Sequence, residues 1–174
     1  MDPMPDIADV NALDRDGFVA LLAATFEHAP WVAERAYAAR PFASVAALHA
    51  AMVGVVRAAP AAERLAFLNG HPELAGAAAR ARQMTADSVA EQGSAGLDAM
   101  TAADFDRFDR LNAAYREKFG FPFIVAVRGR SRDAILEVFE RRLARDADTE
   151  AEAALREIAT ITRMRLDRIV GSGG

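Results

Sequence analysis

The segment His71–Gln92 carries side chains suited to acid–base chemistry at both of its ends. It begins with His71 before Pro72 and ends with the run Ser-Val-Ala-Glu-Gln, Ser88–Gln92. Proline favours the first helical position, so we expect Pro72 to begin a helix with His71 as its N-cap. The helix dipole and free N–H groups there would keep the imidazole neutral and able to accept a proton. Taken alone, His71 is explained better as a simple helix cap.

The Ser88–Gln92 run has a structural alternative of its own. Ser88 and Glu91 have the spacing of a capping box, in which each side chain accepts a hydrogen bond from the other residue's main-chain N–H. That alternative explains both residues without any function, but it does not explain Gln92. Glu91 and Gln92 side by side would offer hydrogen-bond acceptors and donors to an amide-rich ligand.

Arg165 stands out by its position on the last predicted helix. A rotation of ~100° per residue groups the apolar and small residues of this helix in one narrow sector: Leu155, Ile158, Thr162, Leu166 and Ile169. Arg165 falls at the edge of that sector, whereas Arg156 and Arg163 point the opposite way. A guanidinium aimed at the core needs a carboxylate partner or an anionic ligand. On this helix alone, a structural ion pair or a side chain that reaches solvent is the better explanation.

The run Phe121–Val127, FPFIVAV, is apolar although it is too short to be assigned as a helix. We expect a buried, extended chain, because exposed loops are normally polar. The main-chain groups of such a segment must be paired. A connector that crosses the core would pair them within the protein, and a cavity wall would pair them with a ligand.

Residues typical of helix starts recur along most of the remaining chain. They are, in order, Asp14 (for a helix to about Glu27), Pro30, Ser44, Pro60, Thr85 or Ser88, Thr101, Ser131, and Thr149 with Glu152. Gly120 is expected to end the long helix that Thr101 begins. Strand signals are nearly absent. The sequence therefore predicts an all-α fold, a single domain over residues 1–174 built as an irregular bundle of about eight helices, with a loose arm at 1–12 and a flexible tail at 171–174.

Composition narrows the classes of function. The 174 residues suit one domain, and the net charge of −4 gives no basic field for nucleic acid. The chain has no cysteine, which removes disulfides and thiolate chemistry. His28 and His49 have no second ligand at metal spacing, so no metal site is expected. No apolar run approaches the roughly 18 residues of a membrane span and the start lacks a signal-peptide pattern, so we expect a cytoplasmic protein without a membrane partner.

Five stretches, in this order and spacing, resemble one family. They are FEHAPWVAERA with RPF (26–42), HPELAG (71–76), TADSVAEQGSAGL (85–97), LNAAYREKFGFPFIVAV (111–127) and EIATITRMRL (157–166). The family is the 2-oxo-4-hydroxy-4-carboxy-5-ureidoimidazoline (OHCU) decarboxylase family of urate catabolism, and the resemblance extends from about Leu13 to Ile169. Met84 and Met164 replace expected leucines, and a peroxisomal tail of the Ser-Lys-Leu type is missing, which suggests a cytoplasmic member of bacterial type.

The resemblance implies a carboxy-lyase that converts the ureidoimidazoline product of hydroxyisourate hydrolysis to S-allantoin and carbon dioxide. It also implies an all-α homodimer that needs no metal or organic cofactor, and it leaves open whether the enzyme is coupled to hydroxyisourate hydrolase. The family's catalytic residues fall on His71 and Glu91. Its substrate contacts fall on Pro72, Ser88, Val89, Ala90, Glu91, Gln92, Phe123, Ile124, Val125, Ala126, Val127 and Arg165. This coincidence weakens the purely structural explanations of His71, Ser88 and Arg165.

Two alternatives belong to other classes of function. One is a non-catalytic helical module that binds a purine-derived ligand or a protein. The other is a decarboxylase that acts on a related ureido acid. The intact set His71, Glu91, Gln92 and Arg165 argues against the first, because a degenerate paralogue would be expected to lose at least one of them.

Overall fold

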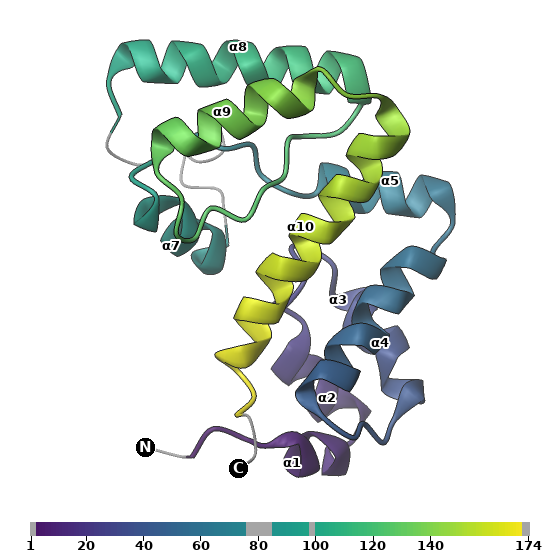
Figure 1. The fold of residues 1–174 in the computed structure, drawn as a ribbon. Coiled ribbons are helices and arrows are strands. Elements are labelled where there is room, and N and C mark those ends of the chain that lie inside the picture. The colour runs from purple at the N-terminus through teal and green to yellow at the C-terminus, as the bar shows by residue number, and fades with distance from the viewer. Residues whose placement is uncertain (1–2, 76–84, 98–99, 172–174) are drawn as a thin grey trace. The chain divides into compact units, whose positions relative to one another are not determined.

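The structure, a computed structural model, describes residues 3–75, 85–97 and 100–171. Within these residues it contains nine α-helices, one short 3₁₀ helix and no strand, so the predicted all-α class is confirmed. The elements are α1 (Ile7–Ala12), α2 (Arg15–Leu22), α3 (Pro30–Ala36), η1 (Tyr37–Ala39), α4 (Val45–Ala58), α5 (Ala61–Asn69), α7 (Ala86–Ser94), α8 (Ala102–Phe119), α9 (Arg132–Leu143) and α10 (Ala147–Asp167) (Figure 1).

The chain divides into two compact units. The first comprises Met1–Gly70 with Ala159–Gly174, and the second comprises His71–Ile158. The boundary therefore falls inside the long helix α10. The organisation of residues 1–174 as a single domain stays a prediction.

Most helix starts lie where the sequence places them. The side chains of Asp14, Ser44, Thr101 and Ser131 each accept a hydrogen bond from the main-chain N–H three residues further on. Such a bond satisfies one of the donors left free in the first turn of a helix. Gly120 ends α8 with φ at 79°, the left-handed conformation that glycine adopts without steric cost.

The first unit is built on α2, α3 and α4, which pack together. Its interior is mainly apolar, with the following apolar side chains at 1% exposure or less: Val10, Phe18, Leu22, Phe26, Val32, Ala33, Ala36, Leu48, Met52, Leu166 and Val170. Leu166 comes from the last part of α10. The end of the chain thus contributes to the core formed by its beginning.

The expectation of a loose arm over residues 1–12 is wrong for residues 7–12, which form α1. Asp6 and Asp9 cap this helix reciprocally, each side chain accepting from the main-chain N–H of the other at 2.9–3.0 Å. Asn11 then exchanges two hydrogen bonds of 2.8 Å with the main chain of Phe42. The start of the expected flexible tail is also attached, because Gly171 N–H donates to the carbonyl of Pro5 at 2.8 Å; residues 172–174 lie outside the described residues.

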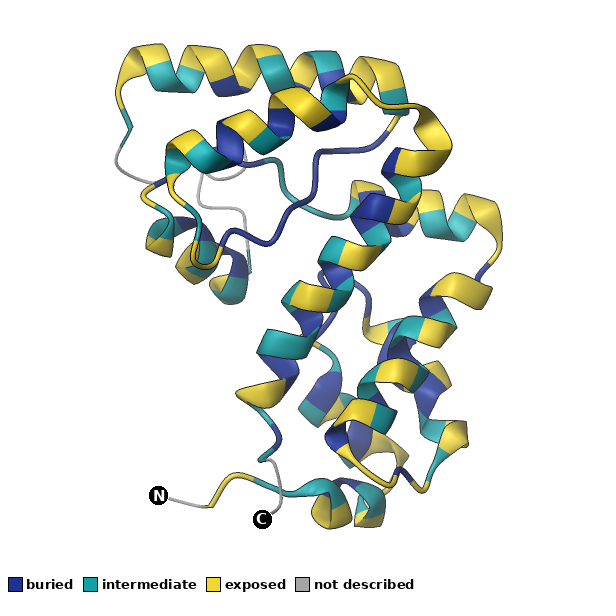
Figure 2. Ribbon diagram, viewed as in Figure 1, coloured by how far each residue is buried: buried dark blue, intermediate teal, exposed yellow. Residues whose placement is uncertain are grey.

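The second unit is built on α8 and α9, which pack against each other, and on the segment that joins them. All seven residues of Phe121–Val127 are buried, and none is helical (Figure 2). The ring of Phe123 stacks on Phe139 with centroids 3.9 Å apart, and it meets Tyr115 edge to face at 5.5 Å. The predicted burial of this segment is confirmed, and its extended conformation stays a prediction.

The last helix begins earlier than its predicted capping box. α10 starts at Ala147, and the main-chain N–H of Thr149 donates to the carboxylate of Asp146 at 2.8 Å. Thr149 is therefore inside the first turn and is not the cap. The hydrogen bonds from Thr149 lower the pKa of Asp146, which keeps its carboxylate ionised as a helix-start anion should be.

α4 and α5 are separated by two residues and bent by 114°. Pro60 accounts for the bend, because the residue before a proline avoids the helical region, and Ala59 has ψ at 148°. In length and apolar composition this bent pair together meets the requirement for a membrane span. No single helix among the described residues is long and apolar enough to do so.

Candidate active site

His71 lies in a loop, His71–Ala75, that follows α5. These residues form bends and turns, so the expected helix with His71 as its N-cap and Pro72 at its first position is wrong for residues 72–75. The remainder of that expected helix, 76–84, lies outside the described residues. Ala75 has φ at 52°, which no helix can accommodate. The side chain of His71 is half-buried.

Two buried amide side chains hold this loop. The Oε1 atom of Gln92 accepts from the main-chain N–H of Ala75 at 3.0 Å, and its Nε2 atom lies 3.5 Å from the carbonyl of Glu73. The Nδ2 atom of Asn112 donates to the carbonyl of Leu74 at 3.0 Å. Gln92 and Asn112 are only 6% and 3% exposed. The loop that carries His71 is therefore attached to both α7 and α8.

Helix α7 is capped by Thr85, whose side chain accepts from the main-chain N–H of Ser88 at 3.3 Å. The capping box that starts at Ser88 is consequently wrong, and that structural explanation of Ser88 no longer applies. Ser88 and Gln92 lie four residues apart on one buried face of the helix. Glu91 is half-buried beside that face, whereas Val89 and Ala90 are exposed.

Two side chains from neighbouring helices hold the segment Phe123–Val127. The carbonyl of Ile124 accepts from Nη1 of Arg142 at 2.6 Å, and the main-chain N–H of Ala126 donates to Oε2 of Glu157 at 3.2 Å. Every residue of the segment is at most 7% exposed. The side chains of α9 and α10 thus fix a main chain that has no regular secondary structure.

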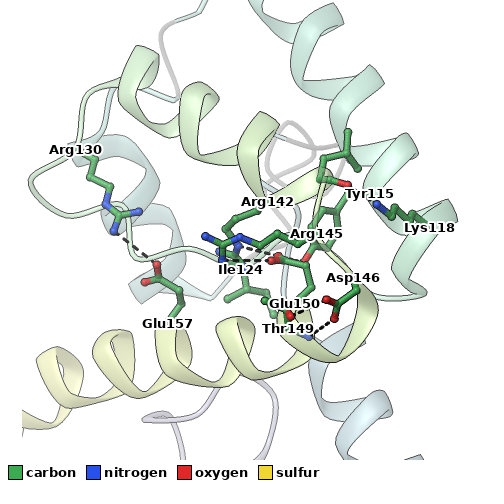
Figure 3. A network of polar contacts seen from close by, with 11 residues as sticks. Tyr115, Lys118, Ile124, Arg130, Arg142, Arg145, Asp146, Thr149, Glu150 and Glu157 are labelled. Carbon is green, nitrogen blue, oxygen red and sulfur yellow. Dashed lines mark hydrogen bonds and ion pairs between the residues drawn. The ribbon is translucent and has the colours of Figure 1, made fainter.

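Arg142 belongs to a buried polar network (Figure 3). Its Nε donates to Oε1 of Glu150 at 2.7 Å, and the same oxygen accepts from the hydroxyl of Tyr115 at 2.6 Å. These three side chains are at most 4% exposed. Burial, with the neighbouring Glu150 carboxylate, raises the pKa of the Tyr115 phenol far above its usual value. Tyr115 therefore remains a donor to Glu150 under all ordinary conditions.

Arg165 lies in the first unit and is 4% exposed. Its Nη1 donates to Oε2 of Glu27 at 2.9 Å, and the Glu27 side chain is 1% exposed. Arg163, in contrast, is 41% exposed and pairs with Asp167 on the same helix. The helical positions predicted for the two arginines are confirmed, and the carboxylate partner that a buried guanidinium requires is Glu27. A role for Arg165 in substrate binding stays a prediction.

Comparison with known proteins gives the family. The model of the OHCU decarboxylase family matches residues 11–167 of this chain. This chain belongs to the OHCU decarboxylase family. The match confirms the family inferred from the five sequence stretches, and with it the expected enzyme class, a carboxy-lyase.

Several curated relatives of this family member are similar along nearly its whole length. The 2-oxo-4-hydroxy-4-carboxy-5-ureidoimidazoline decarboxylase of Haloferax volcanii is 44% identical over 92% of this chain and 93% of its own. The enzyme of the same name from Mus musculus is 34% identical over 96% of this chain and 94% of its own. The uric acid degradation bifunctional protein PucL of Bacillus subtilis is 39% identical, and this chain spans 33% of that longer protein.

Two solved structures share the fold. An (S)-allantoin synthase superposes with a TM-score of 0.73 at 26% identity; 95% of this OHCU decarboxylase family member is covered, but only about half, 54%, of that chain. An OHCU decarboxylase crystallised in the presence of (S)-allantoin superposes with a TM-score of 0.66 over 90% of this chain. At 18% identity, this second likeness shows the fold alone.

Several polar residues of this family member were missed by sequence reasoning. Glu27 was expected at the end of a helix, but α2 stops at Leu22 and Glu27 lies in the turns that follow. Arg142 had a usable signal, because it lies seven residues after the buried Ile135. At ~100° per residue it points within about 20° of Ile135, so the helical rotation that places Arg165 at the edge of the apolar sector also places Arg142 toward the core. Glu157, which binds the segment after α8, had no comparable signal.

His49 is a second partly buried histidine outside the proposed site. Its Nε2 atom lies 2.9 Å from Oγ1 of Thr162. Burial, followed by the nearby positive charge of Arg163, lowers its pKa below 6.5. Among the described residues, no group of three or more histidine, aspartate or glutamate side chains is placed to hold a metal ion.

Proposed function

We propose that this protein decarboxylates 2-oxo-4-hydroxy-4-carboxy-5-ureidoimidazoline to (S)-allantoin and carbon dioxide in urate catabolism. The observation that carries the proposal is the family match over residues 11–167, supported by 44% identity to the Haloferax volcanii decarboxylase over most of both chains. The proposal includes a cytoplasmic homodimer that works without a metal or organic cofactor. Coupling to a hydroxyisourate hydrolase would supply an unstable substrate directly.

The reaction itself defines what the protein has to do. Loss of carbon dioxide leaves an electron pair on the former ring carbon, and the conjugated carbonyl system of the substrate can accept that charge. The protein must hold the ring, place the carboxylate where it can leave, and deliver one proton to one face. Uncatalysed decay yields racemic allantoin, so the enzyme contributes rate and handedness.

The proton chemistry is assigned to His71 and Glu91. His71 acts as the general acid/base that moves the proton during bond cleavage and reprotonation. Glu91 orients the imidazole or binds N–H and hydroxyl groups of the substrate. Support comes from the attachment of the His71 loop to α7, because the hydrogen bond from Ala75 to Gln92 ties the element that carries His71 to the element that carries Glu91.

The remaining predicted residues are assigned to binding. Ser88 and Gln92 bind the ureido arm, with Pro72, Val89 and Ala90 as further contacts, and Arg165 forms a fork to a carboxylate or carbonyl oxygen. The main chain of Phe123–Val127 pairs with ring amides. Gln92 has an additional task in this arrangement, since its amide also holds the loop after His71.

Circular dichroism during urate breakdown tests the proposal. Urate oxidase and hydroxyisourate hydrolase generate the substrate in place, with and without this protein. The expected result is rapid growth of a single-handed allantoin signal, whereas the reaction without the protein decays slowly and stays optically silent. If the protein leaves that decay unchanged, the proposal is rejected. Parallel assays with related ureido acids separate this activity from that of a decarboxylase with another substrate.

A further inference from the structure

Helix side chains bind the main chain of Phe123–Val127 at two residues, and the carbonyl of Val127, at the end of the segment, accepts from the main-chain N–H of Arg130 at 3.1 Å. The two hydrogen bonds to helix side chains involve Ile124, through the carbonyl, and Ala126, through the N–H. In an extended chain, the main-chain groups of alternate residues point to the same side. The bonds at Ile124 and Ala126, two residues apart, both go to helix side chains, Arg142 of α9 and Glu157 of α10, and they define the first edge of the segment.

The opposite edge carries the main-chain groups of Phe123 and Val125. Among the described residues, neither main chain makes a hydrogen bond, although the two residues are only 1% and 4% exposed. Buried main-chain groups are nearly always paired with protein, water or ligand. A ligand rich in N–H and carbonyl groups would supply the partners that this edge lacks.

Arg142 is rigidly placed to hold the first edge. Glu150 accepts from its Nε at 2.7 Å, and the same carboxylate oxygen is fixed by the Tyr115 hydroxyl at 2.6 Å (Figure 3). The guanidinium carbon also lies 4.6 Å from the centre of the Phe123 ring, which gives a cation–π contact. The Arg142 side chain is therefore fixed by its own partners, independently of Ile124.

Glu157 is placed by a looser arrangement. Its Oε2 atom accepts from Ala126, and its Oε1 atom lies 3.6 Å from Nη2 of Arg130 (Figure 3). The side chain is 20% exposed, so it can be changed without leaving a buried charge uncompensated. Glu157 is thus the better residue for a test.

We propose that Arg142 and Glu157 are positioning residues that hold one edge of Phe123–Val127. The main-chain groups of Phe123 and Val125 on the other edge then form a fixed row of donors and acceptors for the ureido and ring amide groups of the substrate. This inference rests on the proposed decarboxylase function. The two charged side chains thus affect substrate affinity only by fixing the position of the main chain.

Kinetics of Glu157→Ala, Glu157→Gln and Glu140→Ala test the inference. The alanine variant loses the acceptor for Ala126, so we expect KM to rise roughly tenfold while kcat stays within about twofold, as for loss of binding shared by substrate and transition state. The glutamine variant keeps an acceptor oxygen but loses the ion pair with Arg130, and it should restore KM. Glu140→Ala is the matched control, because it removes an exposed ion pair with Arg107 and should change neither constant.

Hydrogen exchange of the main-chain amides gives a second readout. In Glu157→Ala, the amides of Phe123–Val127 should exchange faster than in the wild type at an unchanged Tm. Tyr115→Phe keeps the ring but removes one of the two donors to Glu150, and it should raise KM in the same direction by a smaller factor. Tyr115→Phe is used in place of a substitution of Arg142, because loss of that guanidinium would take from the buried Glu150 its nearer cation, leaving only Arg145 at 3.8 Å.

The outcomes separate this inference from the proposed function. An active wild type with an unchanged KM in Glu157→Ala overturns the positioning role and leaves the decarboxylase proposal intact. Equal KM increases in the alanine and glutamine variants also overturn it, because they would assign the effect to the ion pair with Arg130. A wild type without decarboxylase activity overturns the proposed function and, with it, this inference.

Discussion

At the scale of single residues, the buried pair of Arg165 and Glu27 combines two demands on one guanidinium. The two side chains are 4% and 1% exposed and lie 2.9 Å apart. Removing one charge takes from the other, which stays buried, an oppositely charged partner at hydrogen-bond distance, and this costs more than the pair itself contributes to stability. Under the proposed function the same guanidinium also binds the substrate, and its five N–H donors allow one side chain to serve more than one acceptor.

Arg165→Ala should therefore lower both stability and substrate affinity. We expect a loss of about 3–5 kcal/mol in the free energy of unfolding, because the buried carboxylate of Glu27 loses the guanidinium that donates to it at 2.9 Å. Thermal unfolding and KM of the folded fraction measure the two effects. Arg163→Ala is the control, and its exposed pair with Asp167 should contribute at most about 1 kcal/mol. Equal losses of unfolding free energy in the two variants would contradict the assignment of Arg165 to a buried ion pair and Arg163 to an exposed one.

His71→Asn should lower the catalytic rate without destabilising the fold. Asparagine keeps hydrogen-bonding groups at a half-buried position but cannot exchange a proton near neutral pH. Loss of a general acid/base lowers kcat by roughly 10²- to 10⁴-fold, while Tm should change little. The circular dichroism assay gives kcat, and thermal unfolding gives Tm. A folded variant with full activity would rule out His71 as the acid/base.

At the scale of the elements, helix starts were predictable wherever a short polar side chain stands before an apolar periodic stretch. Ser44, Thr101 and Ser131 each act as predicted because their hydroxyl groups accept from main-chain N–H groups that have no partner within the helix. The loop at His71 was not predictable in this way. Its conformation depends on the distant amides Gln92 and Asn112, and local sequence contains no signal for contacts of that kind.

The end of α8 offers a test of one helix stop. Gly120 has φ at 79°, and an L-residue in that conformation costs about 1–2 kcal/mol, so Gly120→Ala should destabilise the protein by that amount. The strain is conformational, because a Cβ atom there would meet no atom within 4 Å. Urea unfolding measures the loss.

Gly54→Ala is the matched control for this prediction. Gly54 lies inside α4, and a Cβ atom there would also meet nothing within 4 Å. Alanine is favoured over glycine in a helix interior by roughly 0.5–1 kcal/mol, so this variant should be stabilised. If both variants shifted in the same direction, backbone conformation would not be what distinguishes the two glycines.

At the scale of the whole molecule, the sequence predicted the fold class and most helices because apolar periodicity and caps are local signals. It also predicted that Phe121–Val127 is buried, since loops rarely expose such an apolar run. It did not predict α1, whose capping box uses Asp9 in place of the usual glutamate or glutamine. The two compact units were not predicted either, because their boundary falls inside the continuous helix α10, where composition does not change.

The stability of the folded molecule should depend on pH through His49. Above its unfolded pKa of 6.5 the imidazole is neutral in both states, so pH has no effect through this group. Between 6.5 and the lower folded pKa, the unfolded chain binds a proton that the folded chain does not, so stability falls as pH falls. Burial and Arg163 cause the lowered pKa, and they outweigh the opposing contributions of Asp167 and the hydrogen bond with the main chain of Ala159.

Urea unfolding from about pH 7.5 to about pH 5.5 measures this dependence. Trp31 is the single tryptophan and lies in the same compact unit as His49, so its fluorescence reports the relevant transition. His49→Gln keeps a neutral amide next to Thr162 and should flatten the decline on the acid side. Asp104 and Asp146 do not interfere, because hydrogen bonds lower the pKa of each carboxyl and keep both ionised throughout this range. An identical decline in wild type and variant would assign the pH dependence to a group other than His49.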